Sequence, residues 1–138
     1  MGTISSQLVD WTRSFAAAVR ARDFATAEEM FLPGVVSFGT VGHALQGREQ
    51  LRRQQWEIVW NRTAGFAFDE SSLVIQEEPN LAVILAEWSS TGYDAAKKSF
   101  LRRGRATIVL RRFETRWLAS HTHFSFTPVA SHDPLLHD

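Results

Sequence analysis

Two histidines near the end of the chain have a spacing that can support chemistry. His121 and His123 stand two positions apart in the segment SHTHFSFTP, residues 120–128. On a strand, residues two apart share one face, so the two imidazoles would lie side by side. Such a pair can bind a metal, transfer a proton near neutral pH, or form hydrogen bonds within a sheet interface. The segment by itself leaves these three interpretations open.

A metal at this pair would need a third protein ligand, because catalytic zinc sites usually have three. The sequence contains no cysteine and no further histidine at a compatible spacing. Asp69 or Glu87 could supply the missing ligand, whereas His132 and His137 belong to a polar C-terminal segment. We therefore predict neither a metal site nor a bound cofactor.

The charge balance restricts the partners of the chain. Fifteen Lys and Arg residues balance fifteen Asp and Glu residues, so the chain lacks the long-range field that favours nucleic acid or an anionic membrane. A length of 138 residues fits a single domain. The first residues lack a secretory signal pattern, and no run approaches the ~18 apolar residues of a membrane span. We expect a cytoplasmic protein whose partner is small and largely apolar, with neither nucleic acid nor a membrane as partner.

Apolar periodicity predicts three helices in the first part of the chain. Residues 5–21 place large apolar side chains at three- and four-residue spacing, which is typical of one helix face. Asp23 can cap a second helix that includes Phe31 and ends at Pro33. A third helix is expected from about residue 48 to 60.

Strand patterns dominate the rest of the chain. Branched and aromatic residues predict a short strand over residues 35–42. Longer runs divided by turn-forming segments predict four more strands, at about residues 64–77, 81–92, 98–113 and 116–127. Short connections between consecutive strands imply an antiparallel meander. Helices followed by a sheet predict an α+β fold in which the helices cover one face of the sheet.

Three short segments carry a resemblance to a known family. They are GRE at residues 47–49, RAT at residues 105–107 and WLASHTHFS at residues 117–125. In this order and spacing, the chain resembles the SnoaL-like group of the superfamily that also holds nuclear transport factor 2 (NTF2) and ketosteroid isomerase. The ending HxHxSxxP is also similar to the association domain of calcium/calmodulin-dependent kinase. The resemblance covers nearly the whole chain.

This resemblance implies an NTF2-like cone. In such a fold a strongly curved antiparallel sheet encloses a hydrophobic pocket, three N-terminal helices close it, and dimers form through the outer face of the sheet. Residues 1–128 would form one domain, and residues 129–138 would form a polar tail. The partners implied are a hydrophobic small molecule and a second copy of the chain in a homodimer.

The ketosteroid isomerase of this superfamily offers a test for catalytic residues. Its chemistry uses an aspartate base, together with a tyrosine and a protonated aspartate that hold the developing oxyanion. By resemblance, the tyrosine falls on Phe15, the base on Gly39 and the second acid on Thr107 or Val109. Phe15 has no hydroxyl group and Gly39 has no proton acceptor. We therefore do not expect the isomerase mechanism in that form, and what remains of it is the pocket.

Arg105 is the candidate for binding an anionic group in that pocket. Because the resemblance places the second acid on the side of Thr107, we expect Arg105 and Thr107 to point inward. A buried guanidinium needs an anionic or strongly polar partner. In the functional interpretation, Arg105 binds a carboxylate, phenolate or enolate of a ligand. In the structural interpretation, it pairs with Asp69, Glu70 or Glu87, or faces solvent.

The same alternation separates the two faces of the last strand. The resemblance places Phe124 over the pocket. His121 and His123 would then lie on the opposite face, which they would share with Trp117 and Ala119, toward a helix or the dimer interface. One of the imidazoles could still act as a general acid or base.

Five tryptophans and ten phenylalanines indicate either a dense core or a flat apolar slot that would suit a polycyclic ligand. Trp56 and Trp60 lie one turn apart on the predicted third helix and can stack. The candidate ligand-binding residues of such a slot are Phe15, Phe38, Trp56, Trp60, Trp88, Thr107 and Phe124.

Two functions from different classes remain open. The first is an isomerase- or cyclase-type enzyme, or an accessory protein, that acts by proton transfer on a hydrophobic, polyketide-like compound in natural-product biosynthesis. In that function Arg105 would stabilise charge, and His121, His123 or Asp69 would carry the proton. The second is a non-catalytic homodimer that binds a ligand or serves assembly.

Overall fold

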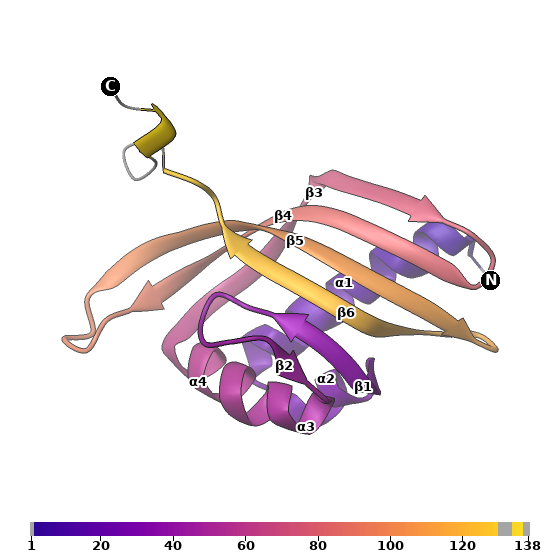
Figure 1. Ribbon diagram of the computed structural model, residues 1–138, viewed down its shortest axis with the longest axis horizontal. Coiled ribbons are helices and arrows are strands. Elements are labelled where there is room, and N and C mark those ends of the chain that lie inside the picture. The colour runs from indigo at the N-terminus through magenta and orange to yellow at the C-terminus, as the bar shows by residue number, and fades with distance from the viewer. Residues whose placement is uncertain (1, 130–133, 137–138) are drawn as a thin grey trace.

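The computed structural model describes residues 2–129 and 134–136, and its central element is a six-stranded sheet (Figure 1). The strand order is β2-β1-β6-β5-β4-β3. The strands are β1 (Phe31–Phe38), β2 (Leu45–Gln46), β3 (Thr63–Glu77), β4 (Leu81–Tyr93), β5 (Ser99–Phe113) and β6 (Arg116–Phe126). Neighbours pair antiparallel except β1 and β6, which are parallel. The α+β class and the meander from β3 to β6 are thus confirmed.

Helix α1 (Ile4–Ala21) confirms the first predicted helix, and it runs behind the sheet in Figure 1. The side chain of Thr3 caps it by accepting a hydrogen bond from a backbone N–H of the first turn. Beyond the helix, the guanidinium of Arg22 donates hydrogen bonds to the carbonyls of Trp60 and Thr63. These bonds tie the end of α1 to the start of β3. The apolar stripe of α1 is buried and includes Leu8, Trp11, Phe15 and Val19.

The second helix is shorter than predicted. Asp23 caps α2 (Phe24–Glu28) as expected, and hydrogen bonds from Thr26 lower the pKa of its carboxyl group. The prediction that this helix includes Phe31 and ends at Pro33 is wrong, because β1 begins at Phe31. Phe31 pairs with the interior strand β6 and its side chain is buried, so tertiary pairing overrides the local helical pattern.

The proline inside β1 is explained by the register of the strand. The pairing of β1 with β6 shifts between Phe31 and Val36, and exposed Pro33 lies within this irregular stretch. A proline has no N–H for a ladder hydrogen bond, and sheets accept it at such irregularities. The strand predicted over residues 35–42 therefore starts earlier and ends at Phe38.

The third helical region, residues 48–62, confirms the predicted helix and contains an irregularity that the sequence does not predict. Its segments are α3 (Arg48–Leu51), the π-helical turn η1 (Arg52–Trp56), α4 (Glu57–Val59) and the 3-10 turn η2 (Trp60–Arg62). Trp56 and Trp60 stack with ring centroids 4.7 Å apart and an interplanar angle of 18°, as expected.

The helices bury the inner face of the sheet. α1 packs against β3, and alternate apolar residues along β4 and β5 are buried. These residues are Ala82, Ile84, Ala86 and Trp88 on β4, and Ala106, Ile108 and Leu110 on β5. None of the helices in the described part of the chain combines the length and the apolar character that a membrane crossing requires.

Candidate functional site

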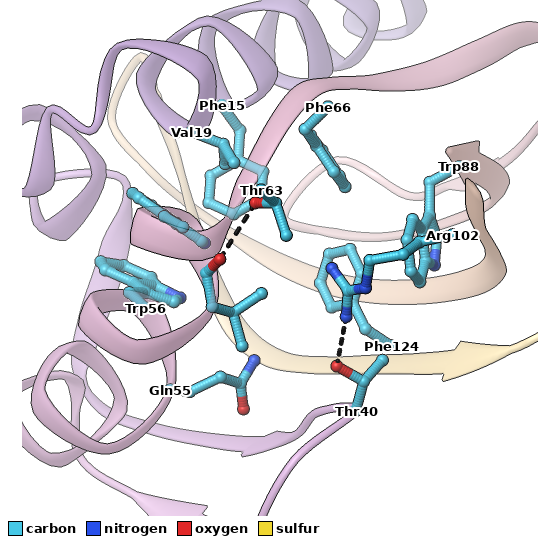
Figure 2. Close-up of a pocket in the computed structure, with 12 residues that line it drawn as sticks. Phe15, Val19, Thr40, Gln55, Trp56, Thr63, Phe66, Trp88, Arg102 and Phe124 are labelled. Carbon is cyan, nitrogen blue, oxygen red and sulfur yellow. Dashed lines mark hydrogen bonds between the residues drawn. The ribbon is translucent and has the colours of Figure 1, made fainter. Parts of the chain in front are cut away.

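A pocket lies against the inner face of the sheet, where α1, the third helical region and β3 to β6 meet (Figure 2). Most of its wall is aromatic or aliphatic. Its polar side chains come from the loop after β1, from η1, from β3 and from β5. The lining residues are Phe15, Val19, Thr40, Gln55, Trp56, Val59, Trp60, Thr63, Phe66, Trp88, Arg102 and Phe124.

The pocket is small. The centre of a water molecule can reach about 50 Å³ of it, whereas sites for drug-sized ligands commonly offer roughly 300–1,000 Å³. A sphere with that much space for water centres would be ~7 Å across once the water radius of about 1.4 Å is added. Such a space suits one aromatic ring, and a polycyclic skeleton would need the walls to move.

Aromatic packing explains why the pocket is narrow. Phe15 is 3% exposed, and its ring contacts those of residues 11, 31, 56, 60, 66, 68 and 124 at centroid distances of 5.3–6.4 Å. Most of the aromatic residues therefore form the core, and only parts of them reach the pocket. Of the predicted ligand-binding residues, those that line it are Phe15, Trp56, Trp60, Trp88 and Phe124.

Among the described residues that form the wall of this pocket, the charged one is Arg102, which is 9% exposed. Its guanidinium donates a hydrogen bond of 2.9 Å to Thr40 Oγ1 and a long one of 3.5 Å to Ser90 Oγ. It also lies over the rings of Trp88 and Phe126, with centroid distances of 5.5 and 5.2 Å. Figure 2 shows this side chain beside Trp88 and Phe124 and its bond to Thr40.

Among the residues that the structure describes, no carboxylate pairs with this cation. None of the ion pairs among the described residues includes Arg102. Burial accordingly lowers the pKa of its guanidinium, because desolvation disfavours the charged form. Cation–π contacts offset part of this cost, but neutral hydroxyl groups and ring faces do not neutralise the charge. None of the described residues therefore neutralises the charge of Arg102.

Gln55 carries a buried polar atom without a hydrogen-bond partner among the described residues. Its side chain is carried by η1, is 8% exposed, and its buried Oε1 accepts no hydrogen bond from the described residues. A Cβ atom at Gly39 would overlap the Gln55 amide. The position to which the resemblance assigns the isomerase base thus has no room for a side chain unless Gln55 moves.

The structure places Arg105 outside the pocket. The prediction that Arg105 and Thr107 point inward is wrong, because the interior side of β5 is formed by Arg102, Ala106 and Ile108. Arg105 is exposed on the outer face, directly opposite Glu87 in the pairing of β4 with β5. Side chains along β5 alternate between the two faces as predicted, but the inner face carries Arg102 and the outer face carries Arg105.

The two histidines also lie on the outer face. The Nδ1 atom of His121 is 2.7 Å from the carbonyl oxygen of Val36, so Nδ1–H donates a hydrogen bond to it. The ring of Phe38 packs edge-on against both His121 and His123, at centroid distances of 5.0 and 5.3 Å. Phe38 and Thr107 therefore belong to the outer face and do not line the pocket.

A bulge changes the side-chain alternation in β6. The pairing of β5 with β6 shifts so that Val109 faces His121 while Leu110 faces Ala119, which leaves Ser120 unpaired. Trp117 and Ala119 are consequently buried on the inner face. The prediction that the histidines share a face with these two residues is therefore wrong.

Asp69 lies apart from the pocket as well. It is exposed, and its Oδ1 accepts hydrogen bonds from the backbone N–H and the hydroxyl group of Ser71. In residues 2–129 and 134–136, no three His, Cys, Asp or Glu side chains form a group that could hold a metal. His132 and His137 lie outside the described residues.

The sequence contains a signal for Arg102, which is one of the polar lining residues that were not predicted. Ala106, Ile108 and Leu110 form the most apolar set on β5, and Arg102 has the same parity. Choosing the interior side by apolar content would have found Arg102. Gln55 carried no comparable signal, because its orientation depends on the π-helical turn.

Several solved structures have a similar overall fold. A protein assigned as a calcium/calmodulin-dependent protein kinase II association domain from Xanthomonas campestris has a TM-score of 0.80 and 18% identity over 92% of this chain and 90% of that one. An NTF2-like superfamily protein from Salmonella enterica has a TM-score of 0.78 and 15% identity over 90% and 91%. A ketosteroid isomerase-like protein from Erwinia carotovora has a TM-score of 0.72 and 14% identity over 87% and 93%.

At these low identities, it is the structural similarity that shows the NTF2-like fold. Among curated proteins, no relative matches this chain. The sequence pattern of the SnoaL-like domain, however, matches residues 9–130, a range that includes every residue that lines the pocket. Since this match covers most of the sequence and agrees with the fold, the chain belongs to the SnoaL-like family.

Proposed function

We propose that this protein binds a small anionic aromatic molecule in the pocket, with Arg102 as the anchor for the anion. The observation that carries the proposal is a buried guanidinium whose partners among the described residues are hydroxyl groups and ring faces. A carboxylate or phenolate could accept charge-assisted hydrogen bonds from the remaining guanidinium donors. The surrounding rings would contact the ring of the ligand.

The lining supports binding rather than proton transfer. Among the described residues, the pocket wall contains no Asp, Glu, His or Tyr side chain. A general acid or base must lie within hydrogen-bond reach of the proton that it moves. Arg105, His121, His123 and Asp69 all lie away from this wall. The proposed function is therefore the non-catalytic one, and its ligand is smaller than the polyketide-like compounds expected from the resemblance.

The test is a comparison of two ligands that differ in charge. We expect 4-fluorobenzoate to bind at least about tenfold more tightly than neutral 4-fluorobenzamide, because only the acid supplies the anion that Arg102 lacks. Fluorine NMR titrations of the purified protein with each compound measure both affinities. Equal affinities, or no binding of the acid, would contradict the proposal.

We further propose that the outer face of the sheet forms a homodimer. This face exposes Val36, Phe38 and Val74, and the Phe38 side chain is 40% exposed. A second copy would cover these apolar side chains together with the two histidines. We expect a dimer in analytical ultracentrifugation at micromolar concentration, and Phe38→Asp should shift it toward the monomer. A wild-type protein that sediments only as a monomer would count against this arrangement.

A further inference from the structure

The polar side chains of the pocket wall differ in whether their hydrogen-bonding groups are already paired. Among the described residues, those that line the pocket besides Arg102 are Thr40, Gln55 and Thr63. Thr40 Oγ1 accepts a hydrogen bond from Arg102, and Thr63 Oγ1 donates one to the carbonyl of Val59. The side-chain amide of Gln55, by contrast, forms no hydrogen bond with the part of the chain that the structure describes.

The two ends of the Gln55 amide have different surroundings. Its Oε1 is buried, and it is the atom that a Cβ at Gly39 would overlap most closely. The oxygen therefore lies against the Cα–H group of Gly39, which a carbonyl oxygen tolerates and with which amide hydrogens would collide. Figure 2 shows the nitrogen on the side of Gln55 that faces the pocket. The amide thus presents a donor, Nε2–H, to the pocket.

The local structure holds Gln55 in this position. It belongs to the π-helical turn η1, and the next residue, Trp56, is 2% exposed and stacks on Trp60. Arg52, at the start of the turn, forms ion pairs with Glu28 and Glu57. Single π-helical turns within helices occur frequently at functional sites. Both ends of the turn are therefore anchored.

An unpaired donor in this wall restricts what can fill the pocket. Gln55 is more than nine-tenths buried, so a ligand that displaces water from Nε2 without replacing its hydrogen bond would lose free energy. The ligand should therefore carry an acceptor at this point. Because the pocket suits a single ring, an acceptor within the ring, such as a pyridine nitrogen, fits best, since it adds no volume.

We infer that the ligand is a heteroaromatic acid of one ring, whose ring acceptor receives a hydrogen bond from Gln55 Nε2, and that Gln55 determines this specificity. The inference rests on the proposed function, since the acid group is assigned to Arg102. Figure 2 shows Gln55 extending from the third helical region and Arg102 extending from β5. The ligand would thus be held by donors from two different elements.

A series of three acids of nearly equal shape tests this inference on the wild-type protein. The probes are benzoate, nicotinate and isonicotinate, in which a ring CH is replaced by nitrogen at the 3- or the 4-position. Isothermal titration calorimetry in mildly alkaline buffer, where the ring nitrogen is unprotonated, gives the dissociation constants. We expect at least one of the two pyridine acids to bind at least about threefold more tightly than benzoate.

Two matched variants assign this preference to one residue. Gln55→Met removes the donor at similar length, whereas Gln54→Met makes the same change at the exposed neighbouring glutamine. In Gln55→Met the preferred pyridine acid should lose at least about tenfold in affinity relative to benzoate, because its nitrogen would be desolvated without a donor. Gln54→Met should keep the wild-type preference.

The outcomes separate this inference from the proposed function. If benzoate binds but neither pyridine acid reaches the expected preference, or if Gln55→Met keeps the wild-type preference, the role of Gln55 is overturned and the anion site stands. If the wild-type protein binds none of the three acids, the anion site itself is overturned, and this inference with it. Should Gln55→Met fail to fold, the wild-type series still decides.

Discussion

Replacing Arg102 by methionine is expected to weaken the binding of 4-fluorobenzoate by at least about tenfold without lowering the stability of the protein. The loss of affinity follows from removing the one cation that the described residues contribute to the pocket wall. Stability should be kept or increased, because a buried charge without a carboxylate is costly and methionine can still pack over Trp88 and Phe126. Fluorine NMR gives the affinity, and urea unfolding gives the stability.

The control for this experiment is Arg103→Met. Arg103 is the next residue on the same strand, but its side chain is exposed on the other face. This variant has the same change in net charge, and it should bind 4-fluorobenzoate like the wild type. An equal loss of affinity in both variants would mean that the binding of the acid depends only on the net charge of the protein. A large loss of stability in Arg102→Met would instead mean that the arginine serves the fold.

Most of the fold could be predicted because the spacing of apolar residues in the sequence indicates which face of each helix or strand is buried. The stripe on α1 and the alternation on β4 and β5 give elements whose limits agree closely with the structure. Asp23 was also correctly identified as a cap, since capping depends on residues a few positions away. Local signals thus located most of the helices and strands.

The failure at Phe31 has a different origin. Its neighbours Ala27 and Phe24 give a helical pattern, and Pro33 resembles a helix terminator. The strand forms there because the distant β6 offers a pairing partner and a buried position for Phe31. Partners so far apart in the chain leave no local trace. The parallel pairing of β1 with β6 was for the same reason not predicted.

The wrong predictions at the site concern which face of a strand points inward. A strand has two faces, and selecting the wrong one replaced Arg102 by Arg105. On β6, the bulge at Ser120 moved Trp117 and Ala119 to the inner face while the histidines stayed outside. A resemblance to a known fold predicts the positions of helices and strands well. It predicts the direction of a side chain only where no bulge or register shift precedes it in the strand.

Replacing Phe15 by alanine is expected to cost about 3–5 kcal/mol of the free energy of unfolding. Phe15 is buried at the centre of the aromatic core and also lines the pocket. Its removal eliminates the ring contacts and leaves a cavity that the surrounding rings can fill only in part. Urea unfolding measures the loss, and Phe113→Ala, at a half-exposed phenylalanine near the end of β5, should change stability by less than about 1 kcal/mol.

Phe15→Ala should also allow the pocket to bind larger ligands. The space left by the Phe15 ring adjoins the site of the ligand, so a two-ring acid such as 2-naphthoate should bind to Phe15→Ala more tightly than to the wild type. The wild-type pocket, with room for one ring, should prefer benzoate over 2-naphthoate. Calorimetric titration of both acids, at a temperature where the variant is folded, measures this change in preference. If the wild type already binds 2-naphthoate better than benzoate, the aromatic core does not limit the size of the ligand.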